Sequence, residues 1–169
     1  MILYSDKENY QHEDAVLKFL AERWGYKHVK SIEKKSSFDG FLYDTYDVGF
    51  DKYNRPTMLV EVRRLNCTSK KHDTAMLSYT KAQSWQSIYP VLKIPVIFCV
   101  NWYDMIGWAD IEDIISYGDI RVSPFSENRK NPKNDREIVF HYPVNKFNQV
   151  GTITDANRLA SVGRKNETP

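Results

Sequence analysis

The chain has 169 residues, of which 41% are hydrophobic, 27% are charged and 14% are aromatic, and its formal net charge is +2. This composition is that of a globular protein, and a chain of this length can bury about 70% of its unfolded surface in a single domain without disulfides. The small net charge means that bulk electrostatics alone give no evidence for a polyanionic partner.

Cysteine, histidine and hydrophobic patterns exclude several other classes. Cys67 and Cys99 form no CxxC motif, and the histidines lack the spacing of zinc ligands, so we expect neither a disulfide scaffold nor a zinc site. The longest apolar run, Ile94–Val100, is too short to cross a bilayer, and the N-terminus has no signal pattern. We therefore expect a protein of the reducing cytoplasm that has no membrane partner.

The first predicted element is a helix over His12–Trp24 that ends at Gly25. Its apolar positions follow helical spacing: Val16, Leu17, Leu20 and Trp24. The same stripe, counted backward, includes Glu13, and an acid on a buried stripe is costly unless a cation or a hydrogen-bond partner receives it. A first-turn carboxylate favoured by the helix dipole is the alternative explanation, and the two can hold together.

A hairpin is predicted next, after a short strand or extended segment over Tyr26–Ser37. Its strands are Phe41–Phe50 and Thr57–Leu65, joined by a turn over residues 52–56. With this turn, Asp47 lies opposite Glu61. Because side chains alternate along a strand, Glu61 and Arg63 project from the face that carries Asp47, while the valines line the other face. The predicted hairpin thus brings two carboxylates together, which would suit Mg²⁺.

Three other aspartates compete with Asp47 for this role. In the same pairing Asp44 faces Arg64, where an ion pair explains it, while Asp51 lies at the turn. The pair Asp39-Gly40 is typical of a turn. We therefore prefer Asp47. The plainer alternative is an ordinary antiparallel hairpin with a polar, solvated face.

The rest of the chain predicts a sheet that helices cover. A helix over Thr74–Tyr89 is bounded by Pro90, and the continuous apolar run Pro95–Val100 is typical of a strand buried on both faces. Trp102, Tyr103 and Trp108 either close the core or stack on unpaired bases. The later elements are a strand at Met105–Ala109, a helix at Ile111–Ser116, a mobile loop at Ser123–Arg136 and a strand at Ile138–Tyr142.

This order of elements, over about residues 10 to 110, resembles the PD-(D/E)XK nuclease superfamily, whose members include restriction endonucleases, RecB-like exonucleases and archaeal Holliday-junction resolvases. The resemblance implies an α/β fold with a restriction-endonuclease-like three-layer core, in which helices flank a mixed central β-sheet. We expect one such domain over residues 1–150, followed by a polar tail at 151–169 that is partly disordered.

The resemblance also implies site residues. Asp47 corresponds to the motif aspartate and Glu61 to the acid of the second half-motif, both ligands of Mg²⁺ or Mn²⁺. The backbone carbonyl of Val62 would complete the protein's share of the coordination, and Glu13 matches the first-helix glutamate of many members.

Arg63 stands where the family has lysine, and this departure matters because a guanidinium stays protonated where a lysine can lose its proton. Arg63 would then bind the scissile phosphate and stabilise developing charge. Alternatively, Lys81 or Gln83 on the following helix takes the place of the lysine. Other basic residues that could contact phosphates, or simply be solvated, are Arg64, Lys70 and Lys71.

The sequence thus predicts a metal-dependent deoxyribonuclease that hydrolyses phosphodiester bonds of DNA, as an endo- or exonuclease. By analogy with small members of the superfamily we also expect a homodimer. Two alternatives stay open. One is a catalytically inactive nucleic-acid-binding module of the same fold, and the other is a non-enzymatic α/β interaction protein.

Overall fold

The computed structural model describes residues 6–31, 38–48, 51–123 and 137–151, with side chains except at 6–9 and 46–53. The helices are α1 (Asp6–Trp24), α2 (Tyr79–Leu92) and α3 (Ile111–Tyr117), with short 3₁₀ turns at Ser69–Lys71 and Val144–Lys146. The strands are β1 (Lys27–Lys30), β2 (Gly40–Val48), β3 (Asp51–Arg64), β4 (Thr74–Ser78), β5 (Val96–Asn101), β6 (Ile106–Asp110), β7 (Asp119–Val122), β8 (Ile138–Pro143) and β9 (Asn148–Gly151).

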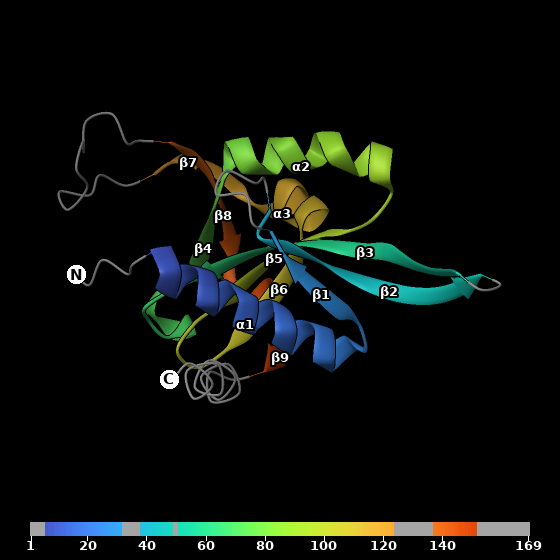
Figure 1. Ribbon diagram of the computed structural model, residues 1–169. Helices are drawn as coiled ribbons and strands as arrows, with labels where there is room; N and C mark the ends of the chain where they lie inside the picture. Colours follow the sequence, from blue (N-terminus) through green and yellow to red (C-terminus); the bar gives the residue numbers. More distant parts are fainter. Residues whose placement is uncertain (1–5, 32–37, 49–50, 124–136, 152–169) are drawn as a thin grey trace.

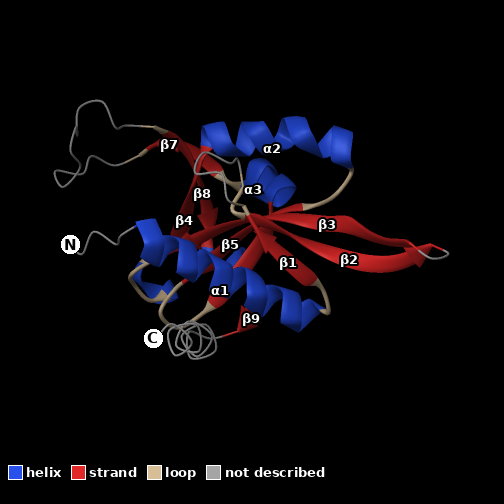
Figure 2. Ribbon diagram, in the orientation of Figure 1, coloured by secondary structure: helices blue, strands red, loops and turns tan. Residues whose placement is uncertain are grey.

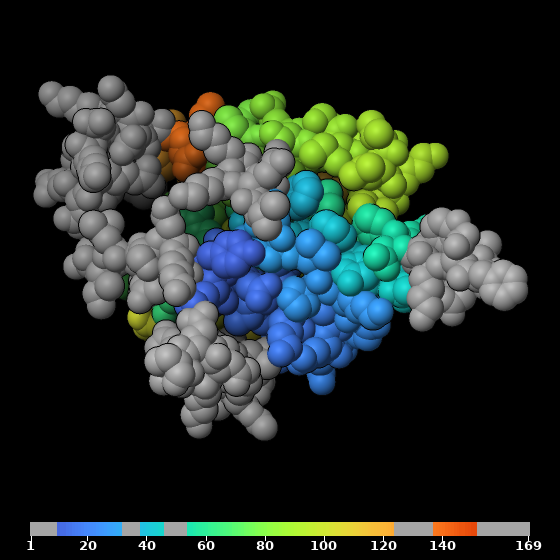
Figure 3. All heavy atoms as spheres, viewed as in Figure 1, coloured from blue at the N-terminus to red at the C-terminus, as the bar shows by residue number. Residues whose placement is uncertain are grey.

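A six-stranded mixed sheet lies at the centre, in the order β1-β2-β3-β5-β6-β9. The pair β3–β5 is parallel and the other neighbours are antiparallel. Helix α1 covers one face of this sheet, and α2 and α3 lie on the opposite side (Figure 1). The space-filling view shows α1 and β1, in blue, on the front of the molecule below α2 (Figure 3). This arrangement confirms the three-layer α/β core with a mixed central sheet.

The alternation of β3 side chains separates two hydrophobic cores. Leu59 joins the core under α2 and α3, whereas Val60 and Val62 join the core under α1. All six residues of β5 are buried, as expected of a strand covered on both faces. Glu61 lies on the same side of β3 as Leu59, so its carboxylate enters the layer that contains α2.

The first helix is confirmed, although it begins at Asp6 rather than His12. Gly25 follows its last residue with a φ of 76°, a left-handed conformation that glycine adopts without strain. The stripe residues Val16, Leu17 and Leu20 are fully buried against the sheet.

The predicted pairing of the hairpin is wrong. Strand β3 runs straight through residues 52–56, where we expected the turn, so Asp47 pairs with Lys52 and not with Glu61. Pro56 fits inside β3 because a bulge occurs there. The pairing shifts between Leu42 and Tyr43, and Thr57, the extra residue, donates its hydroxyl to the Leu42 carbonyl at 3.0 Å. Likewise Asp44 pairs with Arg55 and not with Arg64.

The predicted helix Thr74–Tyr89 is also partly wrong. Its first residues form β4, in which Ala75 and Leu77 are buried and their neighbours are half-buried. This alternation has the period of a strand. Helix α2 begins at Tyr79 and passes through Pro90, and it ends at Lys93, whose left-handed backbone donates to the Tyr89 carbonyl at 2.8 Å.

The later predictions are largely confirmed by β5, β6, α3 and β8, but the sequence did not reveal β7 or β9. With β4 and β8, β7 forms a second sheet in the order β4-β8-β7. Trp102 is buried against Phe147, which supports its core role, while Tyr103 is exposed. Residues 124–136 of the expected loop and 152–169 of the expected tail lie outside the described residues. Among the described helices, none is long and apolar enough to span a membrane.

Candidate active site

The site begins at Gly40, where α1 approaches the sheet most closely. A Cβ atom at this position would lie 2.5 Å from both Leu17 Cδ1 of α1 and the carbonyl oxygen of Val29 on β1. Only glycine fits such a contact without displacing backbone. Glu13 lies one helical turn before Leu17 on the same face of α1, so this close packing carries its carboxylate to the beginning of β2.

Asp39, directly before Gly40, fills the point where β2 and β3 separate. Its backbone N–H donates to the Val60 carbonyl at 3.0 Å, and its carbonyl accepts from Ser31 at 2.7 Å. Beyond Val60 the β2 backbone no longer pairs with β3. There the Asp39 carboxylate takes its place, because Oδ2 accepts the backbone N–H of Val62 at 2.7 Å. The Asp39-Gly40 pair is therefore not a simple turn, and it fixes a carboxylate beside Glu61.

Glu61 is the most buried acid of the group, with 7% of its surface exposed. Its Oε1 is bonded to Nζ of Lys81, which reaches it from the first turns of α2. Of the predicted alternatives for the motif lysine, Lys81 of the following helix is the one that contacts Glu61.

A second lysine, Lys30, joins the other two carboxylates. Its Nζ lies 2.5 Å from Glu13 Oε2 and 3.6 Å from Asp39 Oδ1, and only 8% of its side chain is exposed. The acid on the buried stripe of α1 therefore has a cationic partner, as the sequence required, and this partner belongs to the protein itself.

The electrostatics of the cluster are set by burial. Burial raises the pKa of Glu61 to about 7, the negative charge of Asp39 adds to the rise, and Lys81 opposes it. Burial also raises the pKa of Glu13, with Lys30 opposing. A raised pKa means that the ionised carboxylate is unfavourable in these surroundings, so a proton or a cation that binds to it is favoured.

One carboxylate oxygen of the cluster is left without a partner among the described residues. Glu61 Oε2 is buried and has no hydrogen-bond partner among the described residues. An unpaired carboxylate oxygen in such surroundings is costly, and a divalent cation held with Asp39 would satisfy it. Within the described ranges no three His, Cys, Asp or Glu side chains form a ready metal cage.

Asp47 does not belong to this cluster. Its partner Lys52 lies nine residues before Glu61 on β3, roughly 30 Å away at the usual rise of a strand. Both strands extend well past the helices at that end of the hairpin (Figure 2). The role assigned to Asp47 depended on the mistaken turn, and Asp39 occupies the position that the argument required.

The remaining predicted residues surround the cluster. Arg63 donates from Nη1 to the Met76 carbonyl of β4 at 2.7 Å, and so ties the second sheet to β3. Val62 contributes its N–H to Asp39, and the role of its carbonyl stays a prediction. Arg64 is exposed. Burial of His12 lowers the pKa of its imidazole to about 4, and the positive charge of Arg64 is the second cause of this shift.

The predicted nucleic-acid contacts are spread over two elements. Gln83 is exposed on α2, where its amide donates to the hydroxyl of Tyr79 at 2.9 Å. Lys70 and Lys71 are exposed on the 3₁₀ turn after β3. Their part in binding stays a prediction.

Sequence reasoning missed Asp39 and Lys30 as site residues. A signal for Asp39 was present, since an aspartate directly before a glycine at the start of a strand can mark a close approach of backbone as well as a turn. For Lys30 the sequence offers no comparable signal, because its partners come from α1 and from the residue before β2.

Comparisons with known proteins bear on the family and the fold of the chain. A solved structure described as a nuclease from a fusselovirus superposes with a TM-score of 0.50 and 12% sequence identity, and the match covers 99% of each chain. At this identity the similarity concerns the fold alone. No curated protein matches the chain. A family model described as "Phage putative PDDEXK endonuclease" matches residues 3–150. Because this match spans most of the sequence, the chain belongs to that PD-(D/E)XK endonuclease family.

Proposed function

We propose that this protein is a Mg²⁺- or Mn²⁺-dependent endonuclease that hydrolyses phosphodiester bonds of DNA. The observation that supports the proposal most strongly is the buried, unpaired Oε2 of Glu61 beside the carboxylate of Asp39. Glu61, Asp39 and the backbone carbonyl of Val62 would hold the cation, with Glu13 nearby. The cation would act as a Lewis acid on the phosphate and lower the pKa of water.

Lys81 is the residue that we assign to the reacting phosphate. Its side chain is 41% exposed, so its ammonium group contacts Glu61 and solvent at once. In this position the ammonium group can orient the attacking water and stabilise negative charge that develops on the phosphate. A lysine, unlike Arg63, can also release its proton.

We assign binding of the DNA strand to the basic residues at the end of β3 and on the 3₁₀ turn that follows it. Arg64, Lys70 and Lys71 are exposed, so they can contact phosphates on either side of the cut. Their affinity for DNA would fall as the salt concentration rises. The homodimer that we expect by analogy stays a prediction.

Incubation of the purified protein with linear, circular, single-stranded and branched DNA tests the proposal. We expect cleavage of closed circular DNA in Mg²⁺ or Mn²⁺, because an endonuclease needs no free end, and no cleavage in EDTA. Glu61→Ala should give no products on any of these substrates. An absence of divalent-dependent products from all of them, together with a shift of DNA in a gel, would favour the inactive binding module.

A further inference from the structure

Lys30 differs from an ordinary surface lysine in three respects. It lies on β1 with its side chain almost fully buried, and its ammonium group contacts two carboxylates from two other elements. Its Nζ also lies 5.2 Å from the centre of the Tyr10 ring on α1, within the range of a cation–π interaction. A buried ammonium group with such partners is held in place, because leaving them would expose uncompensated charges.

The ammonium group of Lys30 lies between two carboxylates. Glu13 and Asp39 offer oxygens to the same point, 2.5 Å and 3.6 Å from Nζ. The two oxygens of Asp39 have different partners. Its Oδ1 faces Lys30, and its Oδ2 accepts the backbone N–H of Val62, the residue after Glu61. The cluster therefore has two cation positions. One is filled by Lys30, and the other lies at the unpaired oxygen of Glu61.

We propose that Lys30 is a built-in substitute for a second metal ion, so that this enzyme binds a single divalent cation per chain. The inference rests on the proposed function, because it assigns the number of cations at that same site.

A count of charges supports a single ion. Three carboxylates, Glu13, Asp39 and Glu61, face two ammonium groups, Lys30 and Lys81, which leaves one negative charge when all five are ionised. One divalent cation and one phosphate of the substrate then bring the site to neutrality. A second divalent cation would leave two uncompensated positive charges in surroundings that are largely buried, which is unfavourable.

The test counts Mn²⁺ ions by electron paramagnetic resonance, since free Mn²⁺ gives a strong signal that bound Mn²⁺ loses, and it needs no DNA and no activity. We expect one Mn²⁺ per chain in the wild type, two in Lys30→Met, and one again in Lys30→Met combined with Glu13→Gln. Lys30→Arg should keep one ion, because the fixed positive charge remains.

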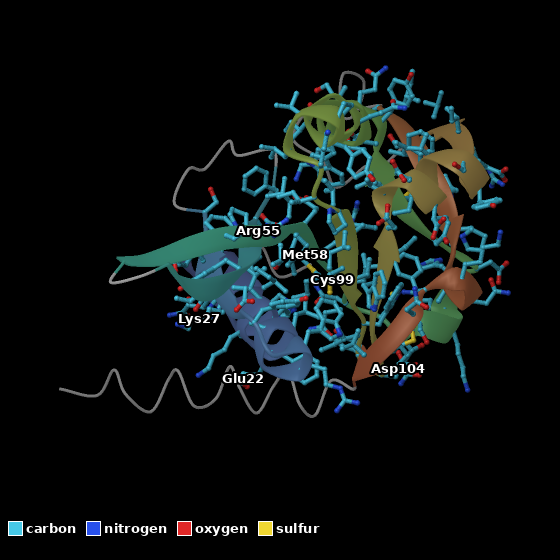
Figure 4. The ribbon with its side chains drawn as sticks, turned by 90° about the vertical axis from the view of Figure 1, so that its right-hand side faces the viewer. Glu22, Lys27, Arg55, Met58, Cys99 and Asp104 are labelled. Carbon is cyan, nitrogen blue, oxygen red and sulfur yellow. The ribbon has the colours of Figure 1, made fainter. Side chains whose placement is uncertain are left out.

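Lys27→Met is the matched control. Lys27 lies on the same strand, but it is exposed and bonds to the hydroxyl of Thr45 at 3.1 Å, so this variant should bind one ion (Figure 4). Two ions in the wild type, or only one in folded Lys30→Met, would overturn the inference. Two ions in the wild type would be decisive even if Lys30→Met does not fold. A wild type that binds no Mn²⁺ would instead refute the proposed function, and this inference with it.

Discussion

Glu61→Gln is expected to abolish cleavage and yet to stabilise the folded protein. The variant keeps the size of the side chain but loses the charge that would hold the cation. Because a bound metal supplies several kcal/mol of transition-state stabilisation, we expect the rate of DNA cleavage to fall by about 10³-fold or more. The free energy of unfolding should rise at pH 8, because burial penalises the ionised carboxylate of Glu61 and the neutral amide of glutamine carries no such penalty.

The gain in stability should depend on pH in a defined way. The pKa of Glu61 is raised from 4.5 to about 7 in the folded chain. Below pH 4.5 both states carry the proton, and the residue contributes nothing. Between pH 4.5 and 7 the unfolded chain loses its proton while the folded chain keeps it, so the free energy of unfolding falls, by about 3 kcal/mol at most. Glutamine has no such penalty.

Thermal unfolding of the wild type and of Glu61→Gln at pH 4.5 and pH 8, without metal, measures this effect. We expect similar melting temperatures at pH 4.5 and a higher one for Glu61→Gln at pH 8. Mg²⁺ should then raise the melting temperature of the wild type alone. Glu22→Gln is the control, because Glu22 is exposed near the end of α1, away from the buried Cys99 (Figure 4). A Glu61→Gln variant less stable than the wild type at pH 8 would contradict the account.

Lys81→Met is the second change with a large expected effect. Methionine keeps the aliphatic part of the side chain and removes the ammonium group that contacts Glu61. We expect the rate of cleavage at saturating DNA to fall by roughly 10² to 10³-fold, because an oriented charge beside the phosphate is lost. Without metal at pH 8 the melting temperature should fall, because the buried carboxylate of Glu61 loses the ammonium group that pairs with it. Lys81→Arg should recover only part of the rate, because a guanidinium group keeps its proton.

Arg63→Met separates the roles of the two cations. This change removes the donor to the half-buried Met76 carbonyl, so we expect the free energy of unfolding to fall by about 1 kcal/mol, the usual net contribution of a hydrogen bond. If Lys81→Met cleaved DNA at the wild-type rate while a folded Arg63→Met did not, the catalytic cation would be Arg63, as the family's strand position implies.

The elements that sequence predicted well are those whose signal is local. The apolar spacing of α1 and the continuous run of β5 have clear periods, and both elements are present as expected. The stripe of α1 also singled out Glu13, because a carboxylate on a buried face must meet a partner. Its partner is Lys30, which no local pattern indicates.

The errors arose where tertiary structure outweighed local preference. Asn54, Arg55 and Pro56 are typical of a turn, but a bulge at Thr57 lets β3 continue through them. The misplaced turn shifts the predicted pairing of the two strands, so that Asp47 is predicted opposite Glu61. In the structure Asp39 lies in that place. Similarly, the alternation of β4 was read as the start of α2, which concealed the second sheet. Lys81 stayed one of two alternatives because its distance from Glu61 depends on how α2 packs over the sheet.

The central claim is that Asp39, and not Asp47, completes the metal site with Glu61. Cleavage of DNA in Mg²⁺ by Asp39→Asn and Asp47→Asn, measured side by side, tests it most directly. Asparagine can still accept the Val62 N–H, so Asp39→Asn should fold normally but lose cleavage by about 10³-fold, as expected for a lost metal ligand. Asp47→Asn should cleave at the wild-type rate. Loss of cleavage in Asp47→Asn, with activity kept in Asp39→Asn, would contradict the account.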